Sequence, residues 1–286
     1  MTDPVITPSG TVPTVTLHDG REIPQLGFGV FKVPPEQTQQ TVEQAFEVGY
    51  RHIDTAEMYG NEAGVGAAIS ASGIPRDELW ITSKLNNPFH RPDDARKAFD
   101  QSLADLGLEQ VDLFLIHWPL PTRYDGDFVS TWRTLVEFHE DGRARSIGVS
   151  NFEPDHLRRI INESGVVPTV NQIEVHPYLG NEAARAANSE HGVATEAWSP
   201  IAKGRVLDDP TVVEVGQRVG RTPSQVTLRW HVQRGDIVFP KSMHRERMEE
   251  NFRLFDFDLS EGDMQAITAL DRGEAGRTGP NPNTFG

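Results

Sequence analysis

Short apolar runs alternate with helix-length amphipathic runs along nearly the whole chain, and this alternation restricts the possible folds more than any other feature. Candidate strands begin near residues 26, 52, 79, 111, 145, 169, 193 and 237. Helical patterns lie between them at residues 36–48, 61–71, 92–106, 130–140, 153–163, 182–191 and 223–232. Eight strand–helix units with no break in composition favour a parallel (β/α)8 barrel over a doubly wound sheet with a second domain. We therefore expect residues 1–286 to form a single barrel domain.

The two ends of the chain lack this alternation. Residues 1–13 contain several prolines, and we expect them to be loose. Next, Asp19 and Gly20 stand between two short extended runs, which predicts a β-hairpin that closes one end of the barrel. Residues 272–286 are rich in glycine, proline and asparagine, which indicates either a loose tail or a flap near the substrate.

Composition excludes several classes of function. The formal net charge is −15, and the one basic cluster lies near Lys241, so we expect neither nucleic acid nor an anionic membrane as a partner. The absence of cysteine excludes disulfides and thiol catalysis. No apolar run reaches the roughly 18 residues of a spanning helix, and the first residues lack a basic, then apolar, leader pattern. We therefore expect a soluble cytoplasmic protein.

Glycine-rich nucleotide motifs do not occur in their usual context. The run G-F-G-V-F-K at Gly27 has Lys32 where a third glycine is needed, and G-V-G-A-A-I at Gly64 lies inside a helical pattern. The small residues at Gly64 are better explained by close packing of a helix. Any bound nucleotide must therefore be held by other means.

Polar and aromatic residues follow seven of the candidate strands. In a barrel the carboxyl ends of all strands face one mouth, which is where such enzymes carry their chemistry. Taken singly, each of these residues also fits a helix cap, a solvated charge or a packed ring. Together they indicate a functional site: Asp54, Tyr59, Lys84, His117, Trp118, Ser150, Asn151, Gln172, Trp198, Ser199, Lys241 and Ser242.

Several motifs carry a resemblance to a known family. They are G-Y-R-H-I-D-T-A-E-M-Y-G-N-E, I-T-S-K-L, V-D-L-F-L-I-H-W-P, R-S-I-G-V-S-N-F, V-N-Q-I-E-V-H-P and F-P-K-S-M-H-R-E-R-M-E-E-N-F, in this order. The chain resembles the aldo-keto reductase family over more than 200 residues. The runs V-F-K-V-P-P, A-W-S-P and D-F-D-L are similar to those of the bacterial 2,5-diketo-D-gluconate reductases. The resemblance implies a monomeric barrel that reduces carbonyl groups with NADPH.

The resemblance implies a catalytic tetrad of Asp54, Tyr59, Lys84 and His117. A phenol can donate a proton to the developing alkoxide, and an adjacent ammonium makes the phenolate less costly. Asp54 would keep Lys84 protonated, and His117 would polarise the substrate carbonyl. No metal is expected, because His52 and Asp54 form only an H-x-D pair without a third ligand.

The resemblance also implies a cofactor site. Ser150, Asn151 and Gln172 would bind the nicotinamide carboxamide, and Trp198 would stack on the ring. The loop that contains Ser199 and Ile201 would cross the pyrophosphate. In the segment after residue 240, Lys241, Ser242 and Arg247 would bind the 2′-phosphate, while Glu250 and Asn251 would bind adenine and Met243 would complete the site. A phosphate dianion favours Arg, Lys and a hydroxyl donor, so NADPH should be preferred over NADH.

The residues around the expected substrate point to small carbonyl compounds. Phe31, Trp118 and Trp198 would form an aromatic mouth, with Met58 and Phe89 as further candidates. Asn86 stands where the sugar-acid reductases often have an aromatic residue, which counts against 2,5-diketo-D-gluconate as the substrate. We therefore expect small aldehydes and α-dicarbonyls as substrates, with keto-sugar acids as a further class. Two other classes remain open: a nicotinamide-binding regulator, like the potassium-channel β subunits, and a Schiff-base aldolase that uses Lys84.

Overall fold

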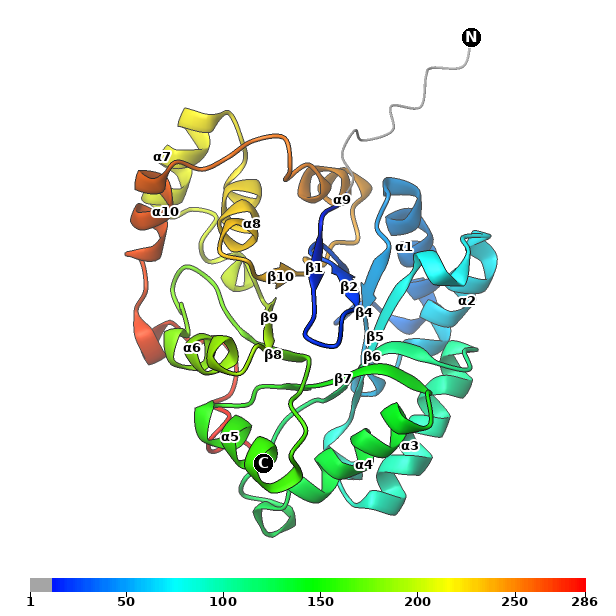
Figure 1. Cartoon of the computed structure of the whole chain (residues 1–286). Helices are drawn as coiled ribbons and strands as arrows, with labels where there is room; N and C mark the ends of the chain where they lie inside the picture. Colours follow the sequence, from blue (N-terminus) through cyan, green and yellow to red (C-terminus); the bar gives the residue numbers. More distant parts are fainter. Residues whose placement is uncertain (1–11) are drawn as a thin grey trace.

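The computed structural model describes residues 12–286 and arranges eight parallel strands in a ring with helices outside it (Figure 1). Neighbours in the ring follow chain order. The ring closes where Leu26 pairs with Val238 and the Gly27 amide donates to the Val238 carbonyl at 2.7 Å. The predicted (β/α)8 barrel is confirmed, with strands β3 (Phe28–Gly29), β4 (His52–Asp54), β5 (Trp80–Leu85), β6 (Val111–Ile116), β7 (Ala144–Ser150), β8 (Val170–Glu174), β9 (Ala194–Trp198) and β10 (Ile237–Val238).

Each of the seven helices expected from the sequence is found, with its ends within about two residues of the prediction. These are α1 (Pro35–Val48), α2 (Glu62–Ser72), α3 (Pro92–Leu106), α4 (Val129–Glu140), α5 (Pro154–Ser164), α6 (Glu182–Glu190) and α8 (Pro223–Gln233). Proline occupies the first turn of α1, α3, α5 and α8, where its missing N–H removes no helical hydrogen bond. Local sequence therefore determined where these helices begin.

Three further helices were not predicted. They are α7 (Pro210–Val219), α9 (Arg245–Phe252) and α10 (Glu261–Thr268). In α10 the buried side chains are Asp263 and Ile267, so the apolar periodicity is too weak to read as a helix. Short 3-10 turns complete the connections: η1 (Glu57–Tyr59), η2 (Arg76–Glu78), η3 (Asn87–Phe89), η4 (Tyr124–Gly126), η5 (Ala202–Gly204) and η6 (Gly273–Gly276).

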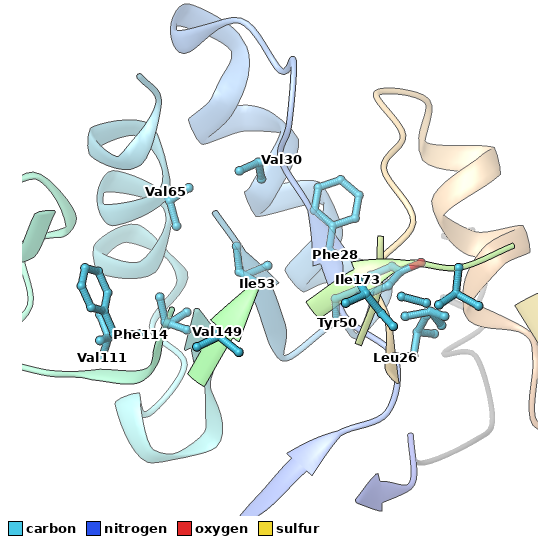
Figure 2. Packing of buried hydrophobic residues seen from close by; sticks show 14 of the residues in the cluster. Leu26, Phe28, Val30, Tyr50, Ile53, Val65, Val111, Phe114, Val149 and Ile173 are labelled. Carbon is cyan, nitrogen blue, oxygen red and sulfur yellow. The ribbon is translucent and has the colours of Figure 1, made fainter. Parts of the chain in front are cut away.

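The main core lies between the strands and the surrounding helices. Figure 2 shows Phe28, Ile53 and Val65 among its buried side chains. Helix α2 approaches its neighbours closely, because a Cβ on Gly66 would lie 2.4 Å from the Leu106 carbonyl oxygen. The small residues near Gly64 therefore serve helix packing, as the sequence predicted, and not phosphate binding.

The N-terminal hairpin closes the amino-terminal end of the barrel. Strands β1 (Thr14–Thr16) and β2 (Glu22–Pro24) are antiparallel and lie over the centre of the ring in Figure 1. Buried Leu17 and Ile23 pack against residues of the barrel interior, namely Trp80, Leu113, Leu115, Val170 and Ile237. The Ser146 hydroxyl also donates to Asp19 in the hairpin turn at 2.6 Å. Because this end is filled, the opposite end is the one open to ligands.

The segment expected to be loose is described only in part. Residues 1–11 lie outside the described residues. Val12 and Pro13 are not loose: Val12 packs against the core, and the Pro13 carbonyl accepts from the Gln25 amide at 2.9 Å. Within residues 12–286, the helices fall short of the length and apolarity that crossing a membrane requires.

We predict that Ile23→Ala lowers the free energy of unfolding by about 2–5 kcal/mol, because it opens a cavity between the hairpin and the barrel interior. Urea unfolding followed by circular dichroism measures this loss. Ile74→Ala removes the same atoms from a half-buried position and should cost clearly less. Equal losses in the two variants would show that the hairpin does not seal the barrel.

Candidate active site

A cleft of about 600 Å³ opens at the carboxyl ends of the strands. Strand ends supply much of its wall, since Asp54 ends β4, Ser150 ends β7 and Trp198 ends β9. Twelve of the residues expected at the site line this cleft: Phe31, Asp54, Tyr59, His117, Trp118, Ser150, Asn151, Gln172, Trp198, Ser199, Ile201 and Lys241. The structure therefore brings together side chains that the sequence separates by up to 210 positions.

A buried ion pair lies at and beneath the bottom of the cleft: Asp54 lines the cleft, whereas Lys84 is fully buried behind it. The Lys84 ammonium donates to both carboxylate oxygens of Asp54, at 2.8 and 2.9 Å, and to the Thr55 carbonyl at 2.8 Å. Both charged side chains are almost fully buried. Strands β4 and β5 are neighbours in the ring, which explains how residues thirty positions apart meet.

The charge of Lys84 is maintained by its surroundings. Burial alone would lower the pKa of its ammonium, but the carboxylate of Asp54, together with Tyr59 and Glu196, raises that pKa above its usual value. Lys84 is therefore a fixed cation at neutral pH.

The half-buried Tyr59 lies between this cation and the open cleft. Its hydroxyl is 3.5 Å from the Lys84 nitrogen, and its ring packs against Phe31 with centroids 5.0 Å apart. Burial raises the pKa of the phenol, and the Asp54 charge adds to this, while Lys84 opposes the rise. The phenol is therefore protonated at neutral pH and lies beside a group that would stabilise its anion.

His117 is the second polar ring at the bottom of the cleft. It stands edge-on to Tyr59 with ring centroids 5.8 Å apart. Burial and the nearby Lys84 cation hold the pKa of His117 well below its usual value, so the imidazole is neutral. Among the described residues its buried Nδ1 has no hydrogen-bond partner. A neutral imidazole here can bind a ligand oxygen without becoming charged.

Asn151, Ser150 and Trp198 form a connected polar wall. The Asn151 amide donates to the His117 carbonyl at 2.9 Å and to the Ser150 hydroxyl at 3.0 Å. The indole N–H of Trp198 donates to the Asn151 oxygen at 2.8 Å. Asn151 has φ +64°, a left-handed conformation that asparagine tolerates. This wall fixes the plane of the Trp198 ring at the side of the cleft.

Glu196, which the sequence reasoning missed, lies behind Gln172. The Gln172 amide nitrogen donates to Glu196 at 2.7 Å and to Asp54 at 2.8 Å. Glu196 lies in the middle of β9 and is fully buried. The sequence pattern that could have revealed Glu196 is a charged residue inside an otherwise uncharged strand run, A-T-E-A-W.

Part of the cleft wall is positively charged, which suits phosphate groups. Lys32, Lys203 and Lys241 line it in a protein whose formal net charge is −15. Burial, together with the neighbouring Lys32, lowers the pKa of Lys241, so these two cations lie close enough to repel each other. Lys32 was not among the predicted site residues. Lys203 was not named singly, but it lies in the loop S-P-I-A-K-G-R-V, which the resemblance placed across the pyrophosphate.

Not every predicted site residue lies in the cleft. Ser242 is buried and bonds its own turn, with the His244 amide donating to its hydroxyl at 3.1 Å. Met243 packs against the core beside it. Arg247, on α9, is exposed and forms no salt bridge within residues 12–286. These three residues do not line the cleft.

Two acceptors expected to bind adenine already have internal partners. Glu250 accepts from the Thr222 hydroxyl at 2.6 Å, and Asn251 accepts from the Ser224 hydroxyl at 2.8 Å. Both contacts join α9 to the start of α8. Neither residue lines the cleft.

The expected substrate residue Asn86 lies outside the cleft. Its side-chain oxygen accepts from the Asn87 amide at 2.7 Å and caps η3, which turns it into its own loop. Phe89 also lies outside the cleft, whereas Met58 lines it. The family resemblance placed Asn86 at the substrate, as the second residue after Lys84, and its contact with a substrate stays a prediction.

The C-terminal tail supplies part of the cleft that the sequence left undecided. Gly279, Pro280 and Phe285 line the cleft, and Phe285 packs on Trp118 with ring centroids 4.5 Å apart. The tail therefore packs against the mouth of the cleft, and its action as a flap over a substrate stays a prediction.

A buried carboxylate holds this tail. Glu174, at the end of β8, accepts from the amides of Thr278 and Gly279 at 2.7 and 3.0 Å. Burial alone would raise the pKa of Glu174, but hydrogen bonds from His176 and the tail lower it, so the carboxylate stays charged. The tail therefore closes one side of the cleft mouth and is held in place by Glu174.

Known proteins resemble this chain in both sequence and structure. The profile of the Aldo/keto reductase family matches residues 25–272. The chain is 48% identical to a methylglyoxal reductase DkgA of Yersinia pestis over 277 residues, covering 96% of this chain and 98% of that protein. It is 47% identical to an aldo-keto reductase of Mycolicibacterium smegmatis over 273 residues, covering 96% and 98%. A crystal structure of a Gox0644 mutant in complex with NADPH has a TM-score of 0.92 and 43% identity, covering 97% of this chain and 100% of the other.

We predict that Asp54→Asn lowers the free energy of unfolding by about 3–5 kcal/mol, because it leaves the buried Lys84 charge without a counter-ion. Urea unfolding of the protein without cofactor measures this. The double variant Asp54→Asn with Lys84→Met should recover part of the loss. Glu137→Gln breaks an exposed pair with Arg96 and should cost about 1 kcal/mol or less. A double variant as unstable as the sum of its single changes would contradict the coupling.

Proposed function

Since the chain belongs to the aldo/keto reductase family, we propose that it is an NADPH-dependent reductase of small aldehydes and α-dicarbonyls, with Tyr59 as the proton donor. The observation that carries this proposal is the arrangement of a protonated phenol, a fixed ammonium and a neutral imidazole at the bottom of one cleft. Carbonyl reduction needs a proton donor and a group that orients the carbonyl, and these residues can provide both.

NADPH would supply the hydride when bound. The NADPH complex of a relative 43% identical to this chain supports this cofactor, as does the group of lysines in an acidic protein. Ser150, Asn151, Gln172 and Trp198 would hold the nicotinamide, and Ser199 and Ile201 would line the path of the pyrophosphate. Lys241, Ser242, Met243, Arg247, Glu250 and Asn251 would bind the adenosine 2′-phosphate end.

Tyr59 would give its proton to the developing alkoxide. The ammonium of Lys84, 3.5 Å away, stabilises the phenolate left behind, and Asp54 keeps that ammonium charged. Because burial raises the pKa of Tyr59, the phenol holds its proton until the substrate oxygen becomes basic. His117, neutral at the same site, would donate a hydrogen bond to the carbonyl oxygen.

The shape of the mouth favours small substrates. Phe31, Trp118, Trp198 and Phe285 line it, and these large rings would limit the size of the carbonyl compound that binds. Similarity to a methylglyoxal reductase supports α-dicarbonyls as one substrate class. Keto-sugar acids, such as 2,5-diketo-D-gluconate, are a further candidate class, because the same subgroup motifs are present.

The two alternative functions fit the site less well. A Schiff-base aldolase needs an uncharged lysine as nucleophile. Here Asp54 holds Lys84 as a buried ammonium, which argues against that chemistry. A regulator that only binds nicotinamide would have no need for the proton-donating contact between Tyr59 and Lys84.

We predict that Tyr59→Phe lowers kcat for NADPH-dependent reduction of methylglyoxal by about 10²–10⁴-fold, because no other group can donate the proton. NADPH oxidation followed by absorbance measures the rate, and NADPH binding should stay intact. The control Tyr50→Phe removes a buried hydroxyl that bonds the Met248 carbonyl, away from the cleft, and should leave kcat unchanged. A Tyr59→Phe enzyme with normal kcat would reject this proton donor. Trapping of substrate on Lys84 by borohydride would favour the aldolase.

We predict that Arg247→Ala weakens binding of NADPH by about tenfold or more but leaves binding of NADH nearly unchanged, because the guanidinium would pair only with the 2′-phosphate. Fluorescence titration of both cofactors measures the two affinities. The matched control is Arg245→Ala, since Arg245 lies on the same helix as Arg247 but pairs with Glu47 of α1 and with Glu249. Equal losses for NADPH and NADH in Arg247→Ala would contradict this role.

A further inference from the structure

Glu196 is a buried acid to which the proposed reaction gives no task. It lies on β9 inside the barrel, with one carboxyl oxygen 2.7 Å from the Gln172 amide nitrogen. Within residues 12–286 its other oxygen is buried and accepts no hydrogen bond. Buried carboxylates normally gather several donors, as Glu174 does in this protein. A neutral carboxylic acid fits the surroundings of Glu196 better than an anion does.

Gln172 joins Glu196 to the buried ion pair. One amide nitrogen donates to both Asp54 and Glu196, at 2.8 and 2.7 Å, so both of its hydrogens are used. Rotating the amide by half a turn would set its oxygen against two carboxyl groups. The side-chain oxygen of Gln172 therefore has a fixed direction, and none of the hydrogen bonds between described residues uses it.

The contacts form a continuous chain across the interior of the barrel. Glu196 bonds Gln172, Gln172 bonds Asp54, Asp54 bonds Lys84, and Lys84 lies 3.5 Å from the Tyr59 hydroxyl. On this geometry, and resting on the proposed function, we propose that Glu196 is a positioning residue that acts through Gln172 on the proton-donating Tyr59–Lys84 pair. Its protonation state would set the high-pH limit of carbonyl reduction.

Few charged groups surround Glu196. Strand β4 contributes Asp54, strand β5 contributes Lys84, and the next buried group on β4, His52, is neutral because burial lowers its pKa to about 4. Strand β8 contributes the uncharged Gln172, and β10 places Ile237 beside Glu196 in the sheet. Burial, assisted by the Asp54 charge, raises the pKa of Glu196 to about 8. Glu196 is therefore neutral at pH 7 and becomes an anion above pH 8.

The direction of the effect follows from the charges. Above pH 8 a second anion joins the Asp54–Lys84 pair. A nearby negative charge favours the protonated forms of both Lys84 and Tyr59. A phenol that holds its proton more tightly is a weaker acid toward the alkoxide. Reduction should therefore slow as Glu196 ionises.

The first test compares pH profiles of kcat/KM for NADPH-dependent reduction. For the wild-type protein we expect a fall of about threefold to tenfold through a midpoint near pH 8. Glu196→Gln keeps an acceptor for Gln172 but cannot ionise, so its fall should begin at least one pH unit higher. The matched control is Glu62→Gln, because Glu62 is also buried, with a pKa raised to about 7. Its hydrogen bonds come from Ser83 and Ser102, which are not part of the series of contacts from Glu196 to Tyr59. Its profile should match the wild type.

A second readout needs neither catalysis nor cofactor. Infrared spectra of the protein alone should contain a protonated-carboxyl band that disappears near pH 8, and this band should be absent in Glu196→Gln but present in Glu62→Gln. Glu196→Asp keeps the acid but shortens its reach to Gln172, so it should retain a titrating band. If Glu196→Gln fails to fold, the infrared measurement can still be made on Glu196→Asp.

The outcomes separate the two proposals. Identical pH profiles for wild type and Glu196→Gln would overturn the role of Glu196 while leaving the reductase intact. If the wild type has no band that titrates near pH 8 and is lost in Glu196→Gln, the role of Glu196 is overturned as well. A wild-type protein that binds NADPH without oxidising it would refute the proposed function, and the infrared result would still stand on its own.

Discussion

The buried Asp54–Lys84 ion pair is the interaction on which the rest of the site depends. Taking two charges out of water is costly, and the cost is offset only if their remaining hydrogen-bonding groups are satisfied. Here the Thr55 carbonyl and the Gln172 amide complete the pair. These contacts require β4, β5 and β8 to stand in one closed ring, so the geometry of the barrel and the charge at the site support each other.

The same burial has different effects on the groups around this pair. It raises the pKa of Tyr59 and Glu196, lowers that of His117, and would lower that of Lys84 if Asp54 were not beside it. One apolar setting thus yields a protonated phenol, a neutral acid, a neutral imidazole and a charged ammonium at the same pH. Only the group with a direct counter-ion keeps its charge.

The two ends of the chain enclose the barrel from opposite sides. The hairpin fills the amino-terminal end through Leu17 and Ile23, while the tail brings Phe285 against Trp118 at the mouth. Apolar packing holds the hairpin, whereas the charged Glu174 holds the tail. The hairpin therefore closes one end of the barrel, and the tail forms part of the entrance at the other end. The buried pair is therefore reached through the mouth at the carboxyl ends of the strands, where Asp54 lines the cleft.

The sequence by itself determined the barrel, seven of its helices, the hairpin and the ring of polar strand ends that includes Asp54, Lys84 and His117, because strand and helix periods and proline positions are local properties. Only the tertiary structure decided that Glu196 joins the site, that Lys32 lines the cleft with Lys241, that the Asn86 side chain caps its own loop and that the tail packs at the mouth. These facts depend on distances across the closed ring and on where each strand ends. No local pattern in the chain encodes such distances, since they arise when β10 meets the segment before β3.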